Sequence, residues 1–147
     1  MKERWWTTPM EGEHGGTIMV SGRDYLEKIM ESGKFPNLIR VSWKYNAQGN
    51  GLPDTQDAEL MERVSEALET EFHADKCAWL VAVYTGEGLR EWIFYAGNLN
   101  IFNKVFNRAL EDIETIPIEI TAESDPDWEE YKEMRGLSYI PENEDEK

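Results

Sequence analysis

The sequence predicts an α+β domain, because segments with the two-residue period of strands alternate with segments that have the 3.6-residue period of helices. The clearest strand is 37–45, in which apolar and polar side chains alternate. The clearest hairpin is 77–96, where two apolar, β-branched and aromatic runs flank a Gly-Glu-Gly turn. The clearest helices are 55–73 and 98–113, each with one apolar stripe.

The order of the predicted elements defines a topology. In chain order they are strand 37–45, helix 55–73, strand 77–85, strand 90–96, helix 98–113 and strand 116–122. This β-α-β-β-α-β order is typical of a ferredoxin-like antiparallel sheet with two helices on one face. Right-handed crossovers place the strands that begin at Asn37 and Arg90 in the middle of that sheet.

Both predicted long helices carry a cap and a buried stripe. Asp54 or Thr55 begins the first helix, and Asn98 is the expected N-cap of the second. The first stripe consists of Leu60, Met61, Val64, Leu68 and Phe72. The second consists of Leu99, Phe102, Val105, Phe106, Leu110 and Ile113.

Further elements are added at both ends of this core. An N-terminal hairpin is expected from runs 5–8 and 16–20, followed by a short helix over 25–32 capped by Ser21 or Asp24. At the other end, Asp125-Pro126 has the form of a cap and a first helical proline. It opens a short helix with Trp128, Tyr131 and Met134 on one face. The sequence leaves open whether the hairpin extends the sheet or covers its open face.

Length and charge suggest one domain with an acidic end. The 147 residues predict a single α+β domain over 1–140, with its core at 37–122 and a disordered acidic tail at 141–147. Residues 1–110 hold 16 acidic and 12 basic side chains, whereas 111–147 hold 14 and 3. Because this acidic surface repels phosphate backbones, we expect no nucleic-acid partner.

The expected compartment is the cytoplasm. Cys77 is the only cysteine, so an intrachain disulfide cannot form, and its apolar surroundings predict an inert thiol. The N-terminal residues lack the apolar core of a signal peptide, and no run is long and apolar enough for a membrane span. We therefore expect no membrane partner.

The open face of the predicted sheet does not have the pattern of an RNA platform. Its outward positions are Arg40, Ser42 and Lys44 on one central strand and Glu91, Ile93 and Tyr95 on the other. RNA-binding sheets of this type carry stacking aromatics at such positions, and this face has few. We expect a solvated or partner-covered surface.

The chain shows no catalytic, metal or cofactor motif. Its two histidines are far apart and give no metal-ligand spacing. The glycines of the 86–88 turn join two strands, whereas a phosphate loop opens a helix. The carboxylates at the start of the last helix are explained by the helix dipole. We therefore expect neither a cofactor nor a metal, and no catalytic residue is assigned.

Aromatic side chains are numerous, with six Trp, six Tyr and five Phe. Four of them, Trp5, Trp6, Trp128 and Tyr139, lie in the appended segments, where they would either pin those segments down or line a protein interface or an apolar pocket. The densest polar and aromatic stretch supplies a candidate binding surface. It consists of Arg90, Glu91, Trp92 and Tyr95, together with Trp128.

Several motifs resemble a known family. These are Leu52-Pro53-Asp54, the run 78–96 with its core VAVYTGEGLREWIFYA, Phe102, and the segment DPDWEEY at 125–131. On these motifs the chain is similar, over roughly 5–131, to the bacterial family catalogued as domain of unknown function 695. The resemblance implies no established activity, catalytic residues or cofactor. Some relatives are joined to, or resemble in fold, the regulator of ribonuclease activity B, which implies by analogy a binding role.

Two functional hypotheses follow. The first is a non-catalytic regulatory module that acts through contact with a protein partner bearing a basic surface. The alternative is a small-molecule-binding domain or an enzyme that uses a pocket between the sheet and the added elements. The oligomeric state is left open. A concave apolar pocket with a few convergent polar groups would favour the alternative.

Overall fold

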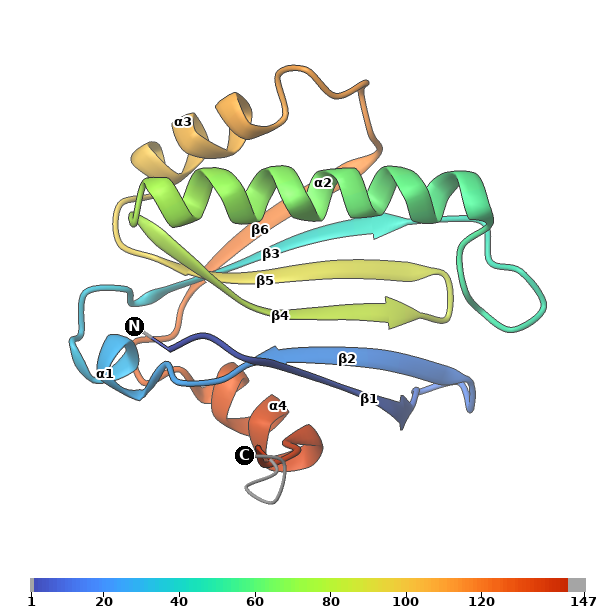
Figure 1. Cartoon of the computed structure of the whole chain (residues 1–147), viewed down its shortest axis with the longest axis horizontal. Coiled ribbons are helices and arrows are strands. Elements are labelled where there is room, and N and C mark those ends of the chain that lie inside the picture. The colour runs from blue at the N-terminus through green and yellow to red at the C-terminus, as the bar shows by residue number, and fades with distance from the viewer. Residues whose placement is uncertain (1, 143–147) are drawn as a thin grey trace.

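The computed structural model describes residues 2–142 and has an α+β architecture with a six-stranded antiparallel sheet (Figure 1). The strands lie in the order β1-β2-β4-β5-β3-β6. Their bounds are Trp5–Glu11 (β1), Thr17–Arg23 (β2), Asn37–Lys44 (β3), Ala78–Gly86 (β4), Leu89–Ala96 (β5) and Ile118–Ser124 (β6). The described helices are Glu27–Glu31 (α1), Thr55–Ala74 (α2), Leu99–Ala109 (α3) and Glu129–Ser138 (α4). The predicted α+β class is confirmed.

The N-terminal hairpin extends the sheet. β1 pairs with β2, and β2 pairs antiparallel with β4 in a register that places Ser21 opposite Val83. The sheet is therefore larger by two strands than the four predicted from 37–122. The strands predicted to begin at Asn37 and Arg90 are β3 and β5, which are neighbours with Val41 opposite Trp92; β5 begins one residue earlier, at Leu89, and the two added strands place β4 and β5 at the middle of the six-stranded sheet.

The two long helices form where their caps and stripes predict them. Asp54 caps α2 by accepting from the Asp57 amide, and Asn98 caps α3 by accepting from the Ile101 amide. α3 ends at Ala109, earlier than the predicted 113. The prediction that Leu99 is buried was wrong: as the first residue of α3 it is 40% exposed.

The short appended helices begin later than predicted, and a left-handed residue precedes each. Tyr25 has φ 60°, which an α-helix cannot accommodate, so α1 begins at Glu27, and neither Ser21 nor Asp24 caps it. Trp128 has φ 55°, so α4 begins at Glu129 and Pro126 lies outside it. Asp125 still serves the helix start, because its carboxylate accepts from the amides of residues 129 and 130.

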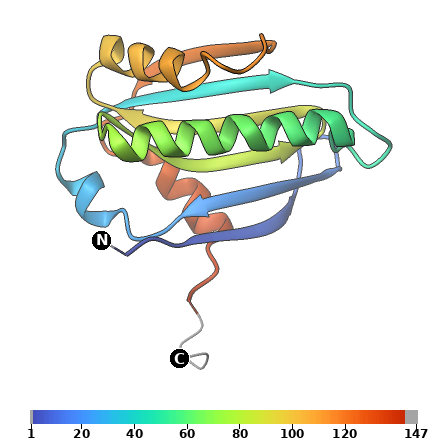
Figure 2. The same cartoon turned by 45° about the horizontal axis from the view of Figure 1, so that its top comes forward.

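Helices cover both faces of the sheet (Figure 2). α2 and α3 pack on one face, over a core that includes Trp92, Phe94 and Phe102. α1 and α4 pack on the other, over a second core that includes Ile93 and Tyr95. The expectation that Ile93 and Tyr95 lie on an open face was wrong, because these appended helices bury both completely. The predicted shared face of Trp128, Tyr131 and Met134 is buried in this second core.

The two ends of the described chain lie side by side. Lys2 forms an ion pair with Glu142, and Tyr25 donates a hydrogen bond to the same carboxylate. The rest of the predicted acidic tail, 143–147, lies outside the described residues. Over residues 2–142, no helix has the length and apolar character needed to cross a membrane.

Candidate functional site: a groove beside helix α2

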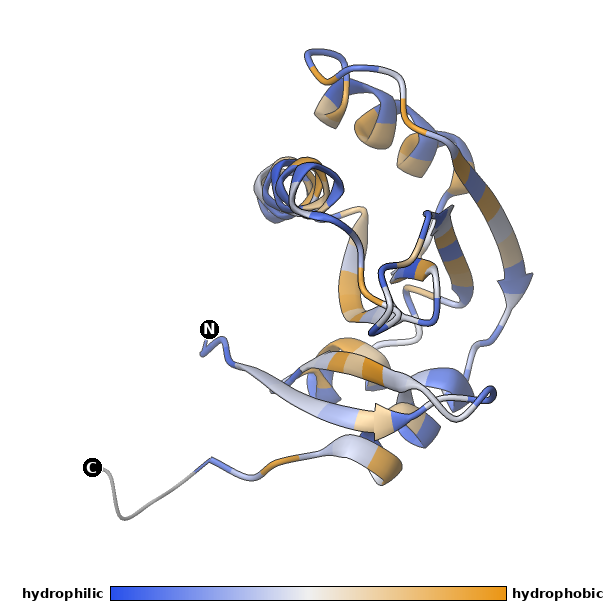
Figure 3. Ribbon diagram, turned by 90° about the vertical axis from the view of Figure 1, so that its right-hand side faces the viewer, coloured by the Kyte–Doolittle hydropathy of each residue, from blue (hydrophilic) through white to orange (hydrophobic). Residues whose placement is uncertain are grey.

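One part of the sheet has no helix over it on the α2 side. Packed helices lie 8–10 Å apart and strands about 4.8 Å apart, so each helix covers about two strands. Two helices therefore cover about four of the six strands. Figure 3 views α2 end-on, with α3 on one side of it and the β1–β2 hairpin on the other. The two helices associated with the hairpin in space, α1 and α4, pack on the opposite face.

A groove of about 520 Å³ occupies the space between α2 and this hairpin. Of its thirteen lining residues, six are apolar and seven are polar or charged. The lining residues are Trp5, Thr7, Met19, Ser21, Leu52, Pro53, Ala58, Glu62, Ser65, Glu69, Val83, Thr85 and Arg90. None of them is fully buried, so each has surface available to a ligand.

Strand register builds the floor of the groove. Thr7, Ser21 and Val83 lie opposite one another across β1, β2 and β4, so their side chains share one face. Thr85 and Arg90 continue that face as a cross-strand pair of β4 and β5. The neighbouring residues along each strand point to the other face.

One flank of α2 forms the wall. Ala58, Glu62, Ser65 and Glu69 follow each other at intervals of four, three and four residues, which places them on one side of a helix. Ala58 has the smallest side chain of the four and leaves room near the start of the helix. Glu62 and Glu69 are exposed, so they form the outer edge of this wall.

The loop between β3 and α2 closes one end. Leu52 and Pro53 contribute its apolar contacts to the groove. The loop is held by Gly51, whose carbonyl accepts from the Tyr45 hydroxyl at 2.8 Å and from the Gly88 amide at 3.2 Å. Gly51 and Gly88 both have φ 81°, a conformation that glycine adopts without strain.

Arg90 is the cation of the groove. Its Nη1 donates to Thr85 Oγ1 at 2.9 Å and its Nη2 to Ser65 Oγ at 3.0 Å. The guanidinium lies 5.1 Å from the ring centre of Trp92, a cation–π distance. Only 12% of the side chain is exposed, and Nε is buried without a hydrogen-bond partner among the described residues. This burial, partly offset by Glu62, lowers the pKa of Arg90 from its usual value.

Arg90 is less well compensated than the arginines that hold the fold together. Arg4 and Arg135 lie 2.9 and 3.0 Å from the carboxylate of Asp24, which is itself buried. Arg90 reaches a described carboxylate only at 4.0 Å, and that group, Glu62, is 79% exposed. The hydroxyls that accept its hydrogen bonds carry no charge. The groove therefore contains a partly desolvated positive charge.

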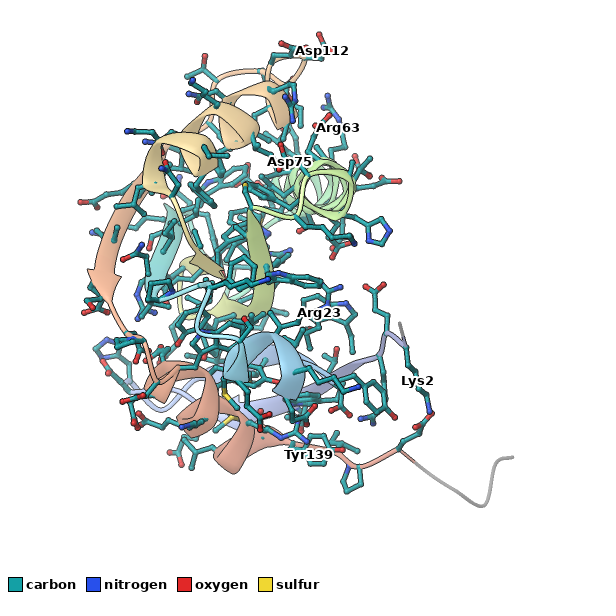
Figure 4. The ribbon with its side chains drawn as sticks, turned by 90° about the vertical axis from the view of Figure 1, so that its left-hand side faces the viewer. Lys2, Arg23, Arg63, Asp75, Asp112 and Tyr139 are labelled. Atoms are coloured by element: carbon teal, nitrogen blue, oxygen red, sulfur yellow. The ribbon has the colours of Figure 1, made fainter. Side chains whose placement is uncertain are left out.

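Glu69 lies where the groove approaches Arg23. Burial, followed by repulsion from Glu3, raises the pKa of Glu69, while Arg23 acts in the opposite direction. Figure 4 shows Arg23 between α2 and the N-terminal strand. Arg23 pairs with the exposed Glu3 at 3.5 Å and lies over the rings of Trp5 and Trp79.

The structure divides the five residues of the predicted binding surface between the two faces. Arg90 and Trp92 point toward α2, and Arg90 alone of the five lines the groove. Tyr95 and Trp128 stack on the opposite face, with ring centres 4.2 Å apart and planes 10° apart. Glu91 is on that face too, where it accepts from the Ser42 hydroxyl and pairs with Arg40. Trp92, Tyr95 and Trp128 are at most 1% exposed, so their surfaces contact protein.

The appended aromatics divide between contacts that hold the added segments in place and the lining of the groove. Trp6 donates from its indole to Ser138 at 3.1 Å and packs edge-on against Tyr139, which fastens α4 to β1. Trp128 donates to the Phe35 carbonyl at 2.9 Å. Trp5, in contrast, lines the groove.

Sequence reasoning missed most of the groove. Met19, Ser21, Ala58 and Val83 carry no chemical motif, and only the tertiary pairing of β2 with β4 brings them together. The available signal was the two-residue spacing of Trp5 and Thr7 and of Met19 and Ser21, which places each pair on one face of its strand. It indicates one half-covered face on each strand of the hairpin.

Comparison with known proteins gives one result. A family model described as a family of unknown function (DUF695) matches residues 5–134. No curated protein and no solved structure matches the chain. The matched segment includes both strands of the N-terminal hairpin, all of α2 and most of α4, and so contains the entire groove. Because the match extends over most of the chain, the protein belongs to the DUF695 family.

Proposed function

We propose that the protein is a small-molecule-binding module and that the groove beside α2 is its binding site. The observation that carries this proposal is the groove itself. Its volume of about 520 Å³ falls in the usual range for small-molecule sites, about 300–1,000 Å³. Apolar side chains from the hairpin, the loop and α2 supply contact area. Arg90, Ser65 and Thr85 supply a few convergent polar groups.

The proposal includes a finer description of the fold. We assign β3, α2, β4, β5, α3 and β6 to a ferredoxin-like unit, an assignment supported by the strand order β4-β5-β3-β6. The β1–β2 hairpin is then an addition at the β4 edge, and the groove lies where the addition meets the unit. This is where α2 no longer covers the sheet.

We also propose a cytoplasmic, non-catalytic role. Burial raises the pKa of the Cys77 thiol to about 11, which makes it a poor nucleophile at neutral pH. The hydroxyls of Ser65 and Thr85 both accept from Arg90, and an accepted hydrogen bond from a cation makes a hydroxyl oxygen less nucleophilic. A thiol and two hydroxyls of low nucleophilicity suit a site that binds its ligand without reacting with it.

A neutral fluorescent probe tests the site. N-phenyl-1-naphthylamine becomes fluorescent on entering an apolar site, and we expect saturable binding to the wild-type protein. Ala58→Trp places an indole in the groove and is expected to weaken binding by about tenfold or more, because the indole fills space that the probe would occupy and covers apolar surface that the probe would contact. Thr7→Trp, from the facing strand, is a second blocking variant.

The matched control is Ala67→Trp. Ala67 lies on the other flank of α2, where it lines a separate hollow toward α3. The control makes the same substitution in the same helix, and binding is expected to be unchanged. Undiminished binding in folded Ala58→Trp and Thr7→Trp proteins would reject the groove as the site.

A second candidate function is contact with a basic protein surface, supported by charge on the opposite face. There Glu91 and Glu130 share one cation, Arg40, at 3.7 and 3.2 Å. Glu133 and Leu137 line a hollow beside them on α4, and Leu137 is 66% exposed. An exposed leucine next to three carboxylates, two of which share a single arginine, suits an interface with a basic rim.

Charge reversal tests this second candidate. Glu133→Lys is expected to abolish retention of a Lys-rich amphipathic peptide on the immobilised protein, and added salt is expected to weaken retention by the wild type. Glu111→Lys, an exposed residue just after α3, is the control for net charge. Equal loss in both variants would mean that net charge, and not this face, attracts the peptide.

A further inference from the structure

The burial and the hydrogen-bond partners of Arg90 indicate what kind of ligand the groove accepts. Resting on the proposed small-molecule function, we infer that the ligand is an amphipathic anion, with an apolar body along the β1–β2 floor and a terminal oxyanion group at Arg90.

The first step concerns hydrogen-bonding capacity. A guanidinium has five N–H donors. The described residues accept from only two of its nitrogens, Nη1 through Thr85 and Nη2 through Ser65. Each of these nitrogens carries a second N–H. A carboxylate or phosphate can accept both in the bidentate geometry that arginine favours.

The second step concerns the local charge. Water is largely excluded from Arg90, whose side chain is 12% exposed, and its nearest described carboxylate lies at 4.0 Å. Burial lowers the pKa of Arg90, which means that its surroundings stabilise the cation less well than water does. An incoming anion would supply the missing compensation in a low-dielectric site, where a charge pair is strong.

The carboxylates beside the groove do not occupy this position. Glu62 is on the exposed outer edge of α2, where solvent screens its charge. Glu62 is 79% exposed, so it can turn into solvent when a ligand arrives. Arg23, beyond Glu69, is a second cation on the same side of the sheet, and it pairs with the exposed Glu3 at 3.5 Å.

The third step concerns orientation. Arg90 and Thr85 are at the β4–β5 side of the floor, whereas Trp5 and Met19 are on the hairpin. Both apolar and charged contacts are then available to one molecule that lies across β4 and β2. The hydroxyls of Thr7 and Ser21 also lie on the hairpin, but they are hydrogen-bonded to each other at 2.9 Å, which leaves Trp5 and Met19 as the apolar contacts there.

Three probes with the same eight-carbon chain separate the possibilities in the wild-type protein by isothermal titration calorimetry. They are octanoate, the neutral octanamide and the cationic octylamine. We expect octanoate to bind about tenfold or more tightly than octanamide, because only the anion forms a charge-assisted pair with Arg90. Octylamine is expected to bind more weakly than octanamide.

Variants then assign the preference to one side chain. Arg90→Gln is expected to reduce octanoate binding to the level of octanamide while octanamide binding persists. Arg90→Lys keeps the charge and is expected to retain part of the preference. Arg63→Gln, on the other flank of α2, removes one positive charge from an exposed position and is expected to change neither affinity.

The outcomes distinguish this inference from the function on which it rests. Equal affinity for octanoate and octanamide, or tighter binding of octylamine, overturns the anionic class and leaves the groove as a binding site. Failure of all three probes and of N-phenyl-1-naphthylamine overturns both. The wild-type comparison does not depend on whether Arg90→Gln folds.

Discussion

Ser65 on α2 accepts a hydrogen bond from Arg90 on β5, with 3.0 Å between Oγ and Nη2. The same hydroxyl oxygen accepts from the indole of Trp92 at 2.9 Å. One small side chain on the wall of the groove thus holds two large side chains of the sheet. This contact fixes the cation at the floor and sets the distance between α2 and β5 at this point.

The first prediction concerns this shared acceptor. Ser65→Ala leaves two buried donors without their partner, and we expect the free energy of unfolding to fall by about 1–3 kcal/mol. Urea denaturation followed by far-UV circular dichroism measures the change. Thr70→Ala, an exposed substitution on the same helix, is expected to change stability by less than about 0.5 kcal/mol. Equal stability of the two variants would show that the hydrogen bonds do not hold the wall.

The second prediction concerns the turn of the N-terminal hairpin. The Glu87 carboxylate accepts from the amides of His14 at 3.0 Å and Gly16 at 3.1 Å, so the β4–β5 turn clamps the β1–β2 turn. Glu87→Ala is expected to accelerate hydrogen exchange at these two amides, with little change in β5. Glu13→Ala, in the clamped turn itself, is the control. Unchanged exchange in Glu87→Ala would contradict the clamp.

The third prediction concerns acid stability. Asp24 is buried, which opposes its charge, but hydrogen bonds from the Tyr25 amide, Arg135, Arg4 and Tyr139 outweigh burial and lower its pKa below the usual 3.8. The unfolded chain then binds a proton more readily than the folded chain. The stability from Asp24 is complete above the usual value and is lost as pH falls through the lowered one.

Asp24→Asn is therefore expected to be less stable than the wild type at pH 7 and to lose less stability between pH 5 and pH 2. Thermal denaturation across this range measures both slopes. Asp112→Asn, an exposed substitution in the turn that follows α3, is expected to follow the wild-type curve. Parallel curves for Asp24→Asn and the wild type would exclude Asp24 as a source of the acid sensitivity.

Local patterns in the sequence predicted the individual elements well. Alternation identified β3, and the caps Asp54 and Asn98 identified the starts of both long helices. Such signals are local, because a cap or a strand face depends on residues a few positions apart. The left-handed Tyr25 and Trp128 were not foreseen, since neither residue type favours that conformation and only the packed structure maintains it.

The general position of the groove could be predicted from the sequence, but its lining residues could not. The sequence suggested a pocket between the sheet and its additions, but the pairing of Ser21 with Val83 that creates the floor joins residues far apart in the chain. Register of this kind depends on the whole sheet. Of the predicted surface, Arg90 alone lines the groove, because alternation along β5 turns Glu91 and Tyr95 to the face that α4 covers.

The most direct test of the groove follows the methionine methyl groups by NMR after selective ¹³C labelling. Met19 lines the groove, whereas Met10 and Met134 line a hollow on the opposite face. During titration with N-phenyl-1-naphthylamine, the account predicts a saturable shift of the Met19 methyl signal, because the aromatic probe comes to lie beside it, with the signals of Met10 and Met134 unmoved. Saturable shifts of Met10 or Met134 with a stationary Met19 signal would contradict it.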